Sequence, residues 1–339
     1  MSRHGSSLRS LTSLLVFSLT ASFAWSDHWK FRNEQGEVEE LDARLVCSDR
    51  GVHVLELPSG TYRLIPQPLV ESREAKDGPA PLTAEQLAAE MAKDYPAELI
   101  RKKATKTYAV VVVLGHKLPK TGEARVQTVL SKAATFMGNS EAVFGNFCKQ
   151  AKLEAQPSRL PLGMLIFETD ADFEKYAARI TKGTKLRTRQ ISGFYSGLTN
   201  LLALRLSECN TFEVPAHEAI HQQTYNRGLF HRLAPVPHWF DEGLATGFET
   251  VSGKINSSPF KISTRYALQA LDDQQEDLGW TKLMQDDSVF GGGGLIGKAY
   301  GQAWGLHWLL LTKHKSGYSR YVKLLTEKTP LRRTVPRNG

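Results

Sequence analysis

The residues with the clearest chemical potential are two histidines and a glutamate within five positions, His217, Glu218 and His221. On an α-helix with about 3.6 residues per turn, the two imidazoles lie one turn apart and about 40° apart around the axis, so both can reach one cation. The carboxylate of Glu218 lies to the side of that line, where it can act on a water without occupying the cation. The spacing therefore predicts a metal site with a general base beside it.

A third ligand is expected from the segment PHWFDEGLA at residues 237–245. Two histidines and one carboxylate form a known ligand set for catalytic zinc, and they leave the fourth position open for water. Glu242 is the preferred carboxylate. The reason is the pair Gly243 and Gly247 beside it. Each glycine costs about 1 kcal/mol inside a helix, which implies that another helix packs closely against the one that carries Glu242. His238 is the main alternative ligand.

Such a site would carry a net charge of about +1, which keeps the ion a strong Lewis acid and brings a bound water to a pKa of about 7. Glu218 would take a proton as this water attacks an amide carbonyl, and would return it to the leaving amine. One Zn²⁺ ion is therefore the expected cofactor, and a peptide or protein the expected substrate. Tyr300 and His307 are candidates to stabilise the oxyanion, and the alternative for each is an ordinary role in helix packing.

Two helices must position these side chains, and the sequence predicts them over residues 215–226 and 238–249. Pro215 falls in the first turn of the former, where its missing N–H costs little. Upstream, apolar runs indicate alternating strands and helices. Strands are expected over residues 108–114, 162–167 and 201–206, a long helix over 122–149 with a break near Gly138, a helix after Thr169, and a turn at 193–197. An α+β domain is therefore expected over residues 105–330.

Residues 27–72 show a different pattern, in which short apolar stretches alternate with turn residues. The stretches cover residues 37–46, 51–57 and 60–66. This spacing predicts a small β-barrel domain. Residues 73–104 are rich in Ala, Lys, Glu and Pro and are expected to form a linker with one helix, in which Thr83 and Gln86 make a capping box.

Residues 1–24 have the pattern of a secretory signal, because Arg3 and Arg9 precede an apolar run that ends in small residues. The run of about 15 residues is shorter than the roughly 20 that cross a membrane, so export with cleavage is expected rather than an uncleaved anchor. The exported chain would be periplasmic or extracellular. Three widely spaced cysteines, Cys47, Cys148 and Cys209, allow at most one disulfide within the chain.

The formal charge of +8 falls to +6 when Arg3 and Arg9 are removed with the signal. The charges are dispersed, with a short basic tail at residues 331–339, so a nucleic-acid partner is not expected. A weak attraction to anionic cell-envelope polymers, through the N-terminal domain, is the remaining expectation for a partner. The sequence does not indicate an oligomeric state.

The metal motif and its surroundings resemble the gluzincin, or peptidase MA-like, zinc metallopeptidases, and are closest to an exported bacterial family of that clan whose function is largely uncharacterised. The resemblance runs from about Thr107 to Glu327 and rests on HEAIHQ from residue 217, NRGL from residue 226 and PHWFDEGLAT from residue 237. It implies a thermolysin-like zinc core in which a strand at residues 201–206 lies at a sheet edge and pairs with an extended peptide. The residues carried over are His217, His221 and Glu242 as ligands and Glu218 as general base.

Two departures from related patterns are informative. Thr224 and Arg227 stand where the metzincin pattern requires Gly and His, which excludes that class. Thermolysin-type enzymes often place an Asp four residues after the third ligand to orient a histidine, but this chain has Thr246 there. Support for the ligand histidines is therefore expected from elsewhere, with Asp241 or a backbone carbonyl as candidates.

Residues 27–72 resemble the SH3-like homology domain first named in the yeast Sla family, through Trp29, the turn at Gly36, the pair Ala43-Arg44 and the hairpin at Ser59-Gly60. The sequence as a whole thus predicts an exported zinc metallopeptidase of α+β fold behind a small SH3-like domain. One alternative is a non-catalytic cell-envelope protein with a relic zinc site, and another is a zinc hydrolase of a non-peptide amide. Glu218 argues against the relic, because a purely structural site has no use for a base beside the metal.

Overall fold

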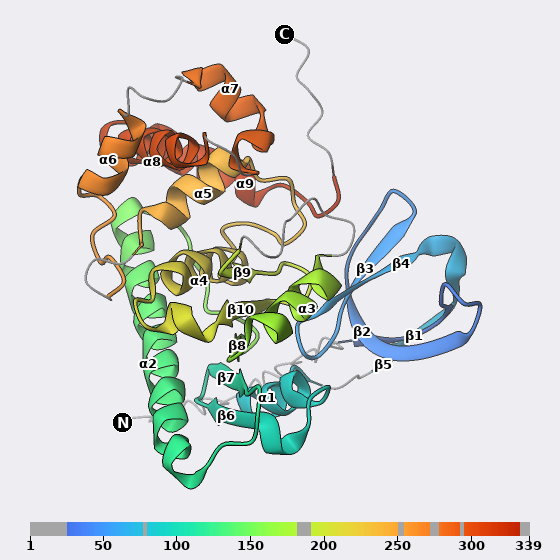
Figure 1. Cartoon of the computed structure of the whole chain (residues 1–339). Coiled ribbons are helices and arrows are strands. Elements are labelled where there is room, and N and C mark those ends of the chain that lie inside the picture. Colours follow the sequence, from blue (N-terminus) through green and yellow to red (C-terminus); the bar gives the residue numbers. More distant parts are fainter. Residues whose placement is uncertain are drawn as a thin grey trace, which may run out of the picture.

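The computed structural model describes residues 26–76, 80–181, 191–249, 254–271, 278–291 and 295–332. Within these residues the chain forms two five-stranded sheets and a set of helices, a mixed α+β architecture as expected (Figure 1). The predicted signal at residues 1–24 and most of the predicted basic tail lie outside the described residues. None of the described helices combines the length and the apolar character needed to cross a membrane.

The first sheet is antiparallel and has the strand order β4-β3-β2-β1-β5. Its strands are β1 (Ser26–Arg32), β2 (Val38–Asp49), β3 (Val52–Glu56), β4 (Tyr62–Pro66) and β5 (Val70–Lys76). A small core around Trp29, Phe31 and Leu55 holds them together. The three predicted strands correspond to β2, β3 and β4. The predicted barrel is not closed within the described residues, because β5 follows η1 (Gln67–Leu69) and pairs with β1, and no pairing joins β5 to β4.

The second sheet has the order β6-β7-β8-β10-β9 and consists of β6 (Ile100–Ala104), β7 (Tyr108–Val113), β8 (Leu162–Phe167), β9 (Gly193–Tyr195) and β10 (Leu201–Arg205). The central strands β7, β8 and β10 are parallel. Their alternating side chains build two cores, with Val110 facing α2 (Lys120–Ala151) and Val111 facing α1 (Ala84–Ala92) and α3 (Asp170–Ile180). The helix α2 runs through Gly138 without the expected break.

The segment at residues 73–104, expected to be a linker, contributes to this sheet. The strand β6 pairs antiparallel with β7, and α1 packs Leu87 and Met91 against the sheet. The predicted capping box is confirmed, since the Thr83 hydroxyl accepts from the amide of Gln86 at 3.2 Å. Leu87 and Met91 of the expected linker are therefore buried against the second sheet.

The strand expected at the sheet edge is not at the edge. β10 lies between β8 and β9, and β9 pairs antiparallel with it through Ala203 and Phe194. Residues 193–197 were expected to form only a turn. Gly193 permits the strand, because a Cβ there would lie 2.5 Å from the Leu204 side chain and 3.1 Å from the carbonyl oxygen of Ala203. Within the described part of the chain, β9 is thus the edge strand on this side of the sheet, and β6 is the strand at the other edge.

The C-terminal half is helical and comprises α4 (Glu213–Asn226), α5 (His238–Thr246), α6 (Thr264–Ala270), α7 (Gly279–Gln285), α8 (Ile296–Lys313) and α9 (Lys315–Thr326). The helix α4 lies between the second sheet and α5 (Figure 1). The predicted reason for Gly243 is confirmed, because a Cβ there would lie 2.5 Å from the carbonyl oxygen of Ala303 in α8. All three cysteines are free thiols.

We expect Gly243→Ala to lower the free energy of unfolding by about 1–3 kcal/mol, because the added methyl group meets helix backbone that cannot move aside cheaply. The matched control is Gly138→Ala in α2, where a Cβ has no neighbour within 4 Å. That change should stabilise the protein by up to about 1 kcal/mol through helix propensity. Urea denaturation followed by circular dichroism measures both, and equal effects of the two substitutions would contradict the packing argument.

Candidate metal centre

Three of the predicted site residues converge between α4 and α5. His217 and His221 lie on one face of α4 with their Nε2 atoms 3.1 Å apart. The Oε2 atom of Glu242, on α5, is 2.9 Å from Nε2 of His217 and 3.8 Å from Nε2 of His221. Ligand atoms on a tetrahedral zinc at about 2.1 Å are roughly 3.4 Å apart, so these spacings suit one small cation. Both imidazoles are buried.

His238, the alternative third ligand, lies outside this cluster of donor atoms. Its side chain is 52% exposed, and its Nδ1 is 3.8 Å from the other carboxylate oxygen of Glu242. Its ring stacks on Phe290 of the short helix η5 (Asp287–Phe290). The structure therefore gathers Glu242 with the two histidines and leaves His238 at the rim.

Each histidine also points its Nδ1 atom at a carboxylate. His221 Nδ1 lies 3.1 Å from Oδ1 of Asp241, whose other oxygen accepts a hydrogen bond from the hydroxyl of Tyr225 at 2.9 Å. His217 Nδ1 lies 3.0 Å from Oε1 of Glu249. Such contacts fix the ring orientation and the tautomer, and they leave Nε2 free for a cation.

Asp241 was a sequence candidate for this supporting role, whereas Glu249 was missed. The helix expected to reach residue 249 ends at Thr246, and Glu249 follows it. The hydroxyl of Tyr266, on α6, donates a hydrogen bond to the same carboxylate. The signal that could have found Glu249 is its spacing of seven residues from Glu242, which places both on one side of a helix.

The charges in the cluster are strongly coupled. Burial alone would lower the pKa of His217, but its hydrogen bonds to Glu242 and Glu249 outweigh burial and raise the pKa to about 10. Burial would raise the pKa of Glu242, but His221 and His217 hold it well below its ordinary range. Without a metal, the carboxylates thus keep protons on the imidazoles. The same negative charge would favour a divalent cation.

Glu218 lies beside the two histidines on α4 and faces the edge strand. Its Oε2 accepts a hydrogen bond from the backbone amide of Tyr195, at the end of β9, at 2.8 Å. Burial raises the pKa of this carboxyl, although the nearby His217 and His221 oppose the shift. A raised pKa makes the carboxylate a stronger base, which suits uptake of a proton from water.

The two candidate oxyanion donors differ in position. The ring of Tyr300, on α8, is 6.0 Å from the ring of His217. Burial, followed by the charges of Glu242 and Glu218, raises the pKa of Tyr300, so its hydroxyl remains a donor at neutral pH.

His307, on the same helix, is a packing residue. Its Nε2 is 2.9 Å from the hydroxyl of Tyr318, and its ring packs on Phe240. Burial lowers its pKa to about 3, which keeps the imidazole neutral. His307 is therefore removed as an oxyanion candidate.

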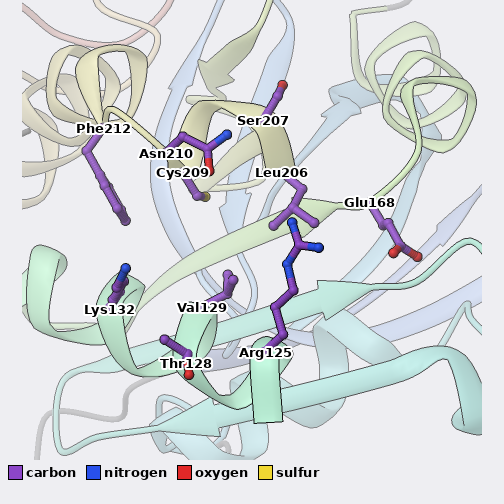
Figure 2. Close-up of a pocket in the computed structure, with 10 residues that line it drawn as sticks. All are labelled: Arg125, Thr128, Val129, Lys132, Glu168, Leu206, Ser207, Cys209, Asn210 and Phe212. Carbon is purple, nitrogen blue, oxygen red and sulfur yellow. The ribbon is translucent and has the colours of Figure 1, made fainter. Parts of the chain in front are cut away.

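A pocket of about 390 Å³ lies elsewhere, between α2 and the short helix η4 (Leu206–Cys209) at the start of α4. Figure 2 shows Arg125 and Lys132 rising from α2 toward η4 and Asn210. The lining includes none of the four predicted site residues. The pocket is therefore separate from the candidate metal centre.

One family model matches part of the chain. Residues 213–332 match a family described as a protein of unknown function, DUF1570. The match begins at the first residue of α4 and includes both histidines, Glu218, Glu242 and Glu249. No curated protein and no solved structure matches the chain. The family match covers the candidate metal centre but assigns no activity to it.

Glu249→Gln should weaken zinc binding about 10-fold to 100-fold, because His217 loses the carboxylate that orients it. A competition assay with a chromophoric chelator measures the affinity directly. Glu85→Gln, on the exposed face of α1, is the matched control and should leave the affinity unchanged. An unaltered affinity in the Glu249 variant would show that this carboxylate does not support the ligand.

Proposed function

We propose that the chain is a zinc-dependent metallopeptidase of gluzincin type. The observation that carries this proposal is the convergence of His217, His221 and Glu242 with Glu218 beside them. Two imidazole nitrogens and one carboxylate oxygen are donors that fit zinc and leave room for a fourth ligand. Bound there, zinc would supply a Lewis acid that activates water and polarises the substrate carbonyl.

Other residues of the site would transfer the proton, stabilise the oxyanion and orient the ligands. Glu218 would take a proton from the attacking water and deliver it to the leaving amine, and its raised pKa makes it a stronger base. The hydroxyl of Tyr300 stays protonated and donates to the developing oxyanion. Asp241 and Glu249 hold the imidazoles in place.

A peptide substrate is favoured by the edge strand next to Glu218. Phe194 pairs with Ala203 in β10. On either side of this pair, the backbone amide of Arg205 donates to the carbonyl oxygen of Ser192, and the amide of Ser196 donates to that of Leu201. Backbone groups alternate along a strand, so those of Gly193 and Tyr195 point away from β10. The Tyr195 amide already donates to Glu218, so a peptide would pair with the backbone groups of Gly193 and the carbonyl of Tyr195. An extended peptide can pair with such an edge, which a non-peptide amide would not need.

Two finer assignments belong to the same proposal. Export rests on the pattern of residues 1–24, and a mature, exported enzyme would act on extracytoplasmic peptides. The SH3-like assignment of the N-terminal domain is supported by five short antiparallel strands around one small core.

Glu218→Gln should keep one zinc per chain and lose about 10²-fold to 10⁴-fold in kcat, because the ligands are intact while the base is gone. The measurement combines metal analysis with cleavage of a peptide library by the mature protein, with and without a chelator. Chelation should abolish the activity of the unaltered protein. Bound zinc with no turnover in either protein would refute the peptidase assignment.

Zinc binding should strengthen with pH. The pKa of His217 is raised to about 10 in the metal-free protein, so below that pH a proton must leave before the imidazole can bind a metal. Each unit of pH between 7 and 9 should therefore raise the apparent affinity about tenfold per proton released. Calorimetry in buffers of different ionisation enthalpy counts the protons, and an affinity that is flat over this range would contradict the expected proton release.

A further inference from the structure

We propose that the N-terminal sheet is a fixed part of the catalytic unit, and that Arg232 is a positioning residue that joins this sheet to the turn after β9. The proposal rests on the proposed function and adds a role for the N-terminal domain. The structural basis is a continuous path of contacts from Glu56 in β3 to Glu218 and His221. Each step of the path is a contact between described residues.

The path begins at a buried ion cluster between the two sheets. Glu56 is 1% exposed and pairs with Arg232 at 2.8 Å, with Arg44 at 2.9 Å and with Arg159. Burial would raise the pKa of Glu56, but the three arginines outweigh it and lower the pKa, so the carboxylate is charged at neutral pH. A buried charge of this kind needs its partners in place, which fixes the two parts of the chain relative to each other.

Arg232 makes the decisive contacts. One of its nitrogens donates to the carbonyl oxygens of Gly60 at 2.7 Å and Gly197 at 3.3 Å. Its guanidinium carbon lies 3.6 Å from the centre of the Tyr62 ring. The Tyr62 amide in turn donates to the carbonyl oxygen of Leu198 at 2.7 Å. One side chain thus clamps the hairpin between β3 and β4 onto the turn at residues 196–200.

This turn is locked to the metal helix. The side-chain oxygen of Asn200 accepts hydrogen bonds from the hydroxyl of Tyr195 at 2.8 Å and from the side-chain amide of Asn226 at 2.7 Å. Its backbone oxygen accepts from the side chain of Gln222 at 3.1 Å. Gln222 and Asn226 belong to α4, immediately after His221. A shift of this turn would therefore move Tyr195, the last residue of β9.

The last step reaches the site by two routes. The backbone amide of Tyr195 holds the carboxylate of Glu218. The ring of Tyr195 stacks on the ring of Tyr225 at 5.8 Å, and the Tyr225 hydroxyl donates to Asp241, which contacts His221. A shift of the turn would displace both the base and the support of one ligand. A flexibly tethered binding module would lack such a buried connection.

The test compares Arg232→Gln with Arg159→Gln. Both remove a positive charge from Glu56, but only Arg232 contacts the turn. We expect Arg232→Gln to lower kcat about 10-fold to 100-fold with one zinc per chain retained. Amide hydrogen exchange in a peptide covering residues 193–197 should become at least about tenfold faster. Arg159→Gln should change both quantities by less than about twofold, because the Arg159 side chain is 46% exposed and Arg44 and Arg232 still pair with Glu56.

Arg232→Lys keeps a charge beside Glu56 but cannot reach both carbonyl oxygens in the same geometry, so it provides a folded variant with an intermediate effect. Equal exchange rates at residues 193–197 in the Arg232 and Arg159 variants would overturn the positioning role. The exchange measurement needs no turnover. If the unaltered protein cleaves no peptide, the proposed function fails. The exchange data would still show whether Arg232 holds the turn at residues 196–200 in place.

Discussion

The structure depends on the burial of two imidazoles among carboxylates in one small volume. Asp241, Glu242 and Glu249 all contact the histidine pair, and none of the three is more than 15% exposed at its side chain. Like charges this close repel strongly away from water, so they require protons on the imidazoles or a cation between them. Without a metal, protons on the imidazoles meet that requirement, and the lowered pKa of Glu242 and the raised pKa of His217 reflect this.

The rest of the fold keeps this cluster in place. Gly243 lets α5 approach α8 closely enough to set Glu242 against α4. On the opposite side, the edge strand β9 holds Glu218 through one backbone amide. The N-terminal sheet reaches the same strand through Arg232, so two regions that look independent in the sequence converge on one site.

The sequence predicted the parts of this arrangement that depend on local spacing. The two histidines share a face because they are four residues apart on one helix, and Gly243 indicated its own packing role. The parts that depend on distant segments could not be seen. β9 is three residues long, and its position depends on pairing with β10 and on contacts with α4, while Arg232 and Glu56 are 176 positions apart. Glu249 was missed although the expected helix reached it, because its contact with His217 joins residues 32 positions apart.

The central claim is that His217, His221 and Glu242 hold one zinc ion. Anomalous diffraction on both sides of the zinc absorption edge, from crystals of the zinc-loaded protein, tests it directly. We predict a single strong peak about 2.1 Å from Nε2 of both histidines and from one oxygen of Glu242. A peak bound by His238 in place of Glu242, or no peak between α4 and α5, would contradict the account.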